Sequence, residues 1–258
     1  MHEVYDSSLD EDVDSHLIEL LFKAIIQNKP QMIELATLLD VNDVNLDLFC
    51  PFPVEHIVRT HHSSSLDSID VKTKIDDETY PETALCTAVR CNNREIINLL
   101  LSKGFDINLN GMGCFEGICL HHASFLNNPS MIRFLLSKGA TINIVDDNKE
   151  NSLHKALRNG QTKTDNGQKL EQTILTLLDA GINVNAQNED GDTPLLLAIL
   201  YKEFNIIPLL LSYKADPKIK NNAQISAFDV ACKFEYKDMI NLFLKEQATN
   251  KRKRAESI

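Results

Sequence analysis

The chain has 258 residues, a formal net charge of −11 and 43% hydrophobic residues. The excess of acidic side chains disfavours nucleic acid as a partner, and no apolar stretch is long enough to cross a bilayer, so we also expect no membrane partner. The six cysteines follow no disulfide framework, which is typical of a reducing compartment.

The N-terminal part divides into three segments. Residues 1–14 are rich in Asp and Glu and lack the pattern of a secretory signal, so we expect an acidic tail and a cytoplasmic protein. Residues 15–45 carry two short apolar stretches around Ala24, which predicts a pair of helices. Residues 46–79 show no leucine pair and no glycine, and we interpret them as a long insertion, since loops of this length are usually functional or disordered.

Residues 80–245 repeat one pattern five times. Each copy has a short apolar stretch that ends in a landmark alanine: Ala88, Ala123, Ala156, Ala198 and Ala231. These alanines lie 35, 33, 42 and 33 residues apart. The interval of 42 exceeds the interval of 33 by nine residues, which predicts a nine-residue expansion within 157–172.

A second landmark follows each alanine. Leucine-rich stretches precede Gly104, Gly139, Gly181 and Lys214, and the glycines fit the left-handed position that ends a helix. Thr193 before Pro194 fits the cap and the first position of a helix. Pro208 falls within the first turn of its predicted second helix, where we expect mild strain but no break.

This pattern resembles the ankyrin repeat, a unit of about 33 residues that opens with Thr-Pro-Leu-His-x-Ala. Thr193-Pro194-Leu195 keeps the first three residues, and His121 and His154 stand at the histidine. The resemblance implies an all-α solenoid of about six helix-turn-helix repeats with β-turn fingers. Residues 15–45 would then form a degenerate capping repeat. In that family the histidine hydrogen-bonds the turn, so we expect structural roles for His121 and His154.

The resemblance also implies a function in binding another protein through the concave face and the turn tips. We therefore expect a monomeric scaffold for one partner protein, with no cofactor, no metal and no catalytic step. The candidate partner-binding residues at the ends of the first helices are Arg90, Phe125, Leu126, Arg158, Asn159, Leu200, Tyr201, Lys233 and Phe234. The candidates at the turn tips are Asp147, Asn148, Glu189 and Asp190.

Three other hypotheses remain open. The many Asn, Ile and Lys residues suggest an AT-rich genome, and by analogy a pathogen effector delivered into a host cell. The basic C-terminal tail, 246–258, contains Lys251-Arg252-Lys253-Arg254 and could direct a nuclear regulator. An enzyme could be built on the 46–79 insertion, which holds Cys50 and three histidines.

Two cysteine pairs could suggest a zinc site, Cys86 with Cys91 and Cys114 with Cys119. Structural zinc sites usually have tighter spacing, and Cys86 and Cys119 stand at helix starts in the repeat pattern. We therefore favour structural roles for these cysteines.

Overall fold

The computed structural model describes residues 24–30, 84–109, 118–159 and 168–245. The chain divides into two compact units, Met1–Cys119 and Leu120–Ile258. The acidic tail, the 46–79 insertion, the basic tail, most of 15–45 and the centre of the expansion lie outside the described residues. No helix among those that are described is long and apolar enough to span a bilayer.

The first unit contains the helix pair α4 (Ala84–Arg90) and α5 (Arg94–Ser102). A tight turn joins them because Asn92 adopts a left-handed backbone with φ of 52°. Asn93 caps α5, since its side chain accepts a hydrogen bond of 3.0 Å from the backbone N–H of Ile96. The two helices pack against each other and bury Leu85 and Leu100.

The short segment 24–30 has the same local geometry as the turn between α4 and α5. The residue four positions after the alanine has positive φ in five copies: Asn28 (53°), Asn92 (52°), Asn127 (49°), Lys202 (63°) and Glu235 (54°). In each copy the next backbone N–H donates to the carbonyl of the alanine, at 2.8 to 3.0 Å. Ala24 therefore stands before a turn of the same geometry as the one that follows the other landmark alanines.

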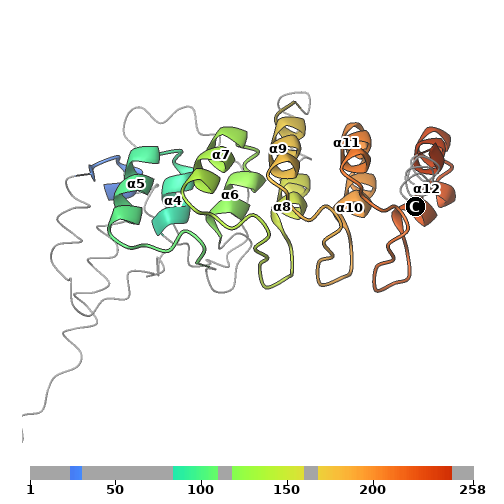
Figure 1. Ribbon diagram of the computed structural model, residues 1–258, viewed down its shortest axis with the longest axis horizontal. Helices are drawn as coiled ribbons and strands as arrows, with labels where there is room; N and C mark the ends of the chain where they lie inside the picture. The colour runs from blue at the N-terminus through green and yellow to red at the C-terminus, as the bar shows by residue number, and fades with distance from the viewer. Residues whose placement is uncertain (1–23, 31–83, 110–117, 160–167, 246–258) are drawn as a thin grey trace, which may run out of the picture. The chain divides into compact units, whose positions relative to one another are not determined.

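The second unit is a row of helix pairs joined by loops that project to one side of the helices (Figure 1). The helices are α6 (Cys119–Phe125), α7 (Pro129–Ser137), α8 (Ser152–Asn159), α9 (Gln168–Asp179), α10 (Pro194–Leu200), the 3₁₀ turn η1 (Phe204–Ile206), α11 (Ile207–Ser212) and α12 (Ala227–Lys233). A further helical segment covers 237–245. The predicted all-α arrangement of paired helices is confirmed, and an isolated bridge joins Lys220 to Ser226.

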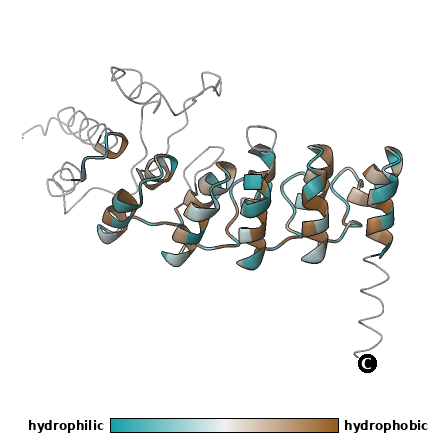
Figure 2. Ribbon diagram, turned by 90° about the horizontal axis from the view of Figure 1, so that it is seen from above, coloured by the Kyte–Doolittle hydropathy of each residue, from teal (hydrophilic) through white to brown (hydrophobic). Residues whose placement is uncertain are grey.

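The core of this unit lies between successive pairs. Helix α7 packs against α9, and α10 packs against both α8 and α12. Apolar and polar residues are segregated around the helices (Figure 2). The landmark alanines Ala123, Ala156, Ala198 and Ala231 are all 0% exposed. A methyl side chain at this position lets the backbones of neighbouring helices approach closely, which explains the landmark.

The three glycines predicted to end helices do so with positive φ: 94° at Gly104, 98° at Gly139 and 83° at Gly181. The fourth copy has Lys214 at this place, and its φ is also positive, at 70°. A side chain in this region of backbone space costs energy that glycine avoids. The fold therefore imposes the left-handed turn even where the sequence does not favour it.

Pro208 changes how the first turn of its helix is wound. The second helices α5 and α7 are α-helical from their first residue, whereas the corresponding segment here begins as the 3₁₀ turn η1. Because Pro208 has no N–H, it cannot donate to the carbonyl of Phe204, which accepts instead from Ile207. The 3₁₀ turn runs directly into α11, so Pro208 alters the winding of the first turn without a break, as expected.

The loops between repeats form hydrogen-bonded fingers that are tied to one another. Asn188 N–H donates to the Asp192 carbonyl at 3.1 Å and so closes one finger. Across fingers, Glu189 N–H donates to the carbonyl of Asn148 at 2.8 Å, and Asn222 N–H donates to the carbonyl of Asp190 at 2.9 Å. These bonds fix the spacing of successive turn tips.

Candidate functional site

The candidate residues of the second unit lie two and three positions after each landmark alanine, where the first helices end. Three of them expose large apolar side chains: Leu126 is 39% exposed, Leu200 is 49% exposed and Phe234 is 56% exposed. Phe125 and Tyr201 are partly exposed, and Lys233 is exposed with its ammonium 5.8 Å from the centre of the Phe234 ring. We call Leu126, Leu200 and Phe234 the helix-end residues.

The same register is polar in the repeat of α8 and α9. The Arg158 guanidinium forms an ion pair with Glu150, so this candidate has a structural contact as well as partial exposure. Asn159 is the last residue of α8. Arg90, the candidate in the first unit, ends α4 and is partly exposed.

The turn-tip candidates combine fixed backbones with exposed acidic side chains. Asp147, Glu189 and Asp190 are exposed, and Asn148 is partly exposed. The backbone groups of Asn148, Glu189 and Asp190 take part in the hydrogen bonds between fingers, while the side chains of Glu189 and Asp190 are exposed to solvent. The tips therefore present negative charge at a spacing that the backbone determines.

An aromatic cluster at the C-terminal end of the described helices was not predicted from the sequence. The Phe204 and Tyr236 rings meet edge to face with centres 5.2 Å apart, and the Tyr236 and Phe234 rings stack at 5.9 Å. Phe204 is 40% exposed. It stands six residues after the landmark alanine, where the other copies have Arg94, Pro129 or Lys237. A phenylalanine at a position that is otherwise charged or proline was the signal that could have identified it.

A buried ionic cluster in the repeat of α8 and α9 was also missed. The Lys155 ammonium is 1% exposed and lies 2.7 Å from Asp146 Oδ2 and 2.8 Å from Glu150 Oε2. The Glu150 carboxylate also pairs with Arg158. Two negative and two positive side chains thus balance. A buried lysine requires such partners because an unpaired charge in the interior is strongly destabilising.

Two histidines contact the turns, as the sequence predicted. His121 Nε2 lies 3.1 Å from the Ile144 carbonyl, and His154 Nε2 lies 3.1 Å from the Asp192 carbonyl. Both are 0% exposed, and burial lowers the pKa of His121 to about 4 and that of His154 in the same direction. Neutral rings that donate to turn carbonyls have a structural role in holding each first helix to its finger.

One contact joins a cysteine of each pair that could suggest a zinc site. The Cys86 sulfur lies 3.6 Å from the Cys119 sulfur, with both thiols buried, while Cys91 is partly exposed. Cys114 lies outside the described residues. In the described ranges, no group of three or more His, Cys, Asp or Glu side chains could hold a metal ion.

Comparison with known families identifies the repeat. A model of "Ankyrin repeats (3 copies)" matches residues 164–254, one of "Ankyrin repeats (many copies)" matches 120–164, and one of "Ankyrin repeat" matches 82–111. The chain belongs to the ankyrin-repeat family. Ankyrin repeats are generally modules of protein–protein interaction, so the helix ends and turn tips of this ankyrin protein are the surfaces to consider first.

Several curated ankyrin-containing proteins are similar to this chain over part of their length. Putative ankyrin repeat protein FPV031 of Fowlpox virus is 32% identical over 166 residues, which are 62% of this chain and 46% of that protein. A putative ankyrin repeat protein of Acanthamoeba polyphaga mimivirus is 34% identical over 28% of this chain and 44% of its own length. Alpha-latrotoxin-Lt1a of Latrodectus tredecimguttatus is 36% identical over 30% of this chain and 5% of the toxin. The chain thus matches less than half of each relative.

Proposed function

We propose that this ankyrin array binds one partner protein through the helix-end residues and turn tips of its second unit. The observation that carries the proposal is the exposure of Leu200 and Phe234, at 49% and 56%. Other copies have Arg158 or Lys233 at the position of Leu200, and the copy of α8 has Asn159 at the position of Phe234. Large apolar side chains gathered at one edge of a structure usually mark an interaction surface.

The exposed apolar area is sufficient to matter energetically. Covering a half-exposed leucine or phenylalanine contributes on the order of 1–2 kcal/mol to association. The acidic turn tips Asp147, Glu189 and Asp190 would add charge complementarity, which favours a partner with basic groups opposite them. The aromatic cluster supplies the side-chain type that dominates binding hot spots.

We further propose that the partner is a host protein and that the chain acts as an effector. The similarity to ankyrin proteins of Fowlpox virus and of Acanthamoeba polyphaga mimivirus supports this hypothesis. The chain would act by binding alone, a proposal supported by family matches that all describe ankyrin repeats. The enzyme hypothesis concerns the 46–79 insertion, outside the described residues, and stays a prediction.

Affinity capture from a eukaryotic lysate tests the binding surface. The double variant Leu200→Ser/Phe234→Ser should lose a protein that the unmodified chain captures. Leu175→Ser is the matched control, since Leu175 is 39% exposed on the second helix α9, away from the helix ends. A partner captured equally by all three proteins would exclude the helix-end surface.

The nuclear alternative depends on Lys251-Arg252-Lys253-Arg254, which lie outside the described residues. Truncation after Asn250 should then move the protein from the nucleus to the cytoplasm. An unchanged distribution would reject the basic tail as a nuclear signal.

A further inference from the structure

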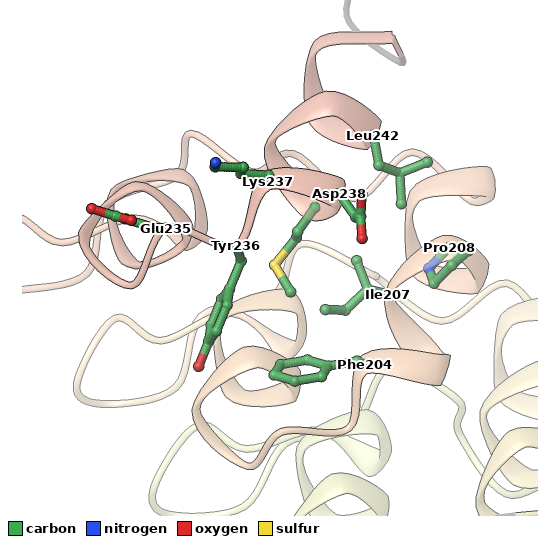
Figure 3. A pocket seen from close by; sticks show the side chains of 9 residues that line it. Phe204, Ile207, Pro208, Glu235, Tyr236, Lys237, Asp238 and Leu242 are labelled. Carbon is green, nitrogen blue, oxygen red and sulfur yellow. The ribbon is translucent and has the colours of Figure 1, made fainter.

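A groove of about 550 Å³ lies between the segment Phe204–Pro208 and the helical segment 237–245 (Figure 3). Its lining is mostly apolar and includes Phe204, Ile207, Pro208, Tyr236, Met239 and Leu242. Residues of two neighbouring repeats of the second unit therefore form one concave apolar surface.

The groove follows from two departures from the repeat pattern. Pro208 replaces the first α-helical turn with η1, and Phe204 stands where other copies have Arg94 or Pro129. The Phe204 ring contacts Tyr236, which in turn stacks on Phe234. The groove is thereby continuous with the helix-end residue Phe234.

The groove carries negative charge at its edge. Glu235, Lys237 and Asp238 all belong to its lining. The Asp238 carboxylate is directed toward Ile207 and Pro208, whereas the Glu235 carboxylate and the Lys237 ammonium are directed away from them (Figure 3). Within the described residues neither carboxylate forms an ion pair. An apolar wall beside an uncompensated carboxylate is complementary to a basic side chain with a long apolar stem.

We infer that this groove binds a segment of the partner protein in which a lysine or arginine lies close to a large apolar residue. The stem of the basic residue packs along Pro208 and Leu242, and its charge pairs with Asp238. The apolar residue packs on Phe204, where an aromatic face also attracts a cation. This inference rests on the proposed function, because it specifies the chemistry of the partner at the C-terminal edge of the binding surface.

Peptide selection on the full chain tests the inference. Random peptides about twelve residues long, displayed on phage, span a groove of this kind and need no known partner. Selection should enrich sequences that pair Lys or Arg with an aromatic residue, leucine or methionine. Synthetic versions should lose about fivefold to tenfold in affinity for Asp238→Asn, and similarly for Phe204→Ala. Circular dichroism establishes that both variants keep their helical content.

A charge reversal separates recognition from a general effect on the fold. Selection on Asp238→Lys should enrich acidic residues in place of basic ones, while Glu171→Lys, a reversal at an exposed position on α9, should leave the basic preference unchanged. An absence of enriched peptides, or the same preference on Asp238→Lys, would overturn the inference. Peptides that lose affinity for Leu200→Ser/Phe234→Ser but not for Asp238→Asn would overturn the groove alone and leave the proposed function standing.

Discussion

The repeat of α8 and α9 and the repeat of α10 and α11 fill one buried position with opposite chemistry. The residue before the landmark alanine is Lys155 in the first and Leu197 in the second, with exposures of 1% and 6%. Leu197 packs in an apolar core that the capped sequence Thr193-Pro194 begins. Lys155 is instead surrounded by the carboxylates of Asp146 and Glu150.

The fold buries this position in both repeats, but the sequence places a charged side chain there in one repeat and an apolar side chain in the other. Leu197 is stable in the interior because it is apolar, whereas the Lys155 ammonium is stable there only when carboxylates pair with it. Charged partners must come from the preceding finger, so the repeat of α8 and α9 depends on its loop for stability, whereas α10 depends on neighbouring helices.

Removing the buried ammonium should be the most damaging change. Lys155→Ala leaves Asp146 and Glu150 facing each other in the interior and should lower the free energy of unfolding by about 3–5 kcal/mol. Urea titration followed by circular dichroism measures this loss. A combined Asp146→Asn/Glu150→Gln/Lys155→Leu variant should recover most of it, since no charge is then left unpaired. A loss below about 1 kcal/mol for Lys155→Ala would contradict the ionic account.

Acid should destabilise the histidine-containing repeats selectively. Burial lowers the pKa of His121 from 6.5 to about 4, so the unfolded chain binds a proton between these values that the folded chain does not. The free energy of unfolding should therefore fall as the pH decreases from 6.5 to 4, by about 2–4 kcal/mol from this group.

The register offers a control for the acid effect. Leu196 stands in α10 where His121 stands in α6, so His121→Leu should flatten the pH dependence of unfolding measured between about pH 7 and about pH 4.5. Hydrogen exchange should locate the acid sensitivity in α6 and α8 before α10. An equally steep dependence in His121→Leu would assign the effect to other groups.

An added side chain should destabilise the protein more at the contact between two fingers, at Gly191, than at the helix end at Gly181. A side chain at Gly191, where φ is 78°, would meet the backbone nitrogen of Asn222 at 2.8 Å. Gly191→Ala should lower the free energy of unfolding by about 2–3 kcal/mol. Gly181→Ala shares the positive φ of 83° but meets nothing within 4 Å, and should cost about 1 kcal/mol. Equal thermal midpoints for the two variants would argue against packing between the fingers.

The smallest expected effect is an increase in the free energy of unfolding. Lys214 holds a left-handed φ of 70° at a helix end that has glycine in three other repeats. Lys214→Gly should raise the free energy of unfolding by about 0.5–1 kcal/mol, because relief of backbone strain exceeds the added entropy of the unfolded chain. The same substitution at Lys218, an exposed residue outside any helix, is the control and should not stabilise.

The sequence predicted the repeat architecture because spacing encodes it directly. The landmark alanines, Gly104 with its equivalents and His154 occupy positions whose geometry recurs in several of the described copies. The positions of helices in the described segments could therefore be read from periodicity alone, and Ala24 could be aligned across a gap of two periods.

The features that distinguish this array could not be read in that way. Lys155, Asp146 and Glu150 are unremarkable as single charged residues, and their pairing depends on how one finger folds under its helix. Phe204 and Pro208 help to form the groove because the segment between them begins as a 3₁₀ turn. The sequence predicted only mild strain at Pro208. Departures from a repeat pattern therefore indicate where to look, while their consequences require side-chain geometry.

Photo-cross-linking can show whether the partner protein contacts the helix-end residues. A photoreactive phenylalanine derivative placed at Phe234 of the full chain should cross-link to the captured partner in cell lysate, and the same group at Leu175 should not. Cross-linking from Phe234 alone would establish the helix ends as the binding surface. Efficient cross-linking from Leu175 with none from Phe234 would contradict the account.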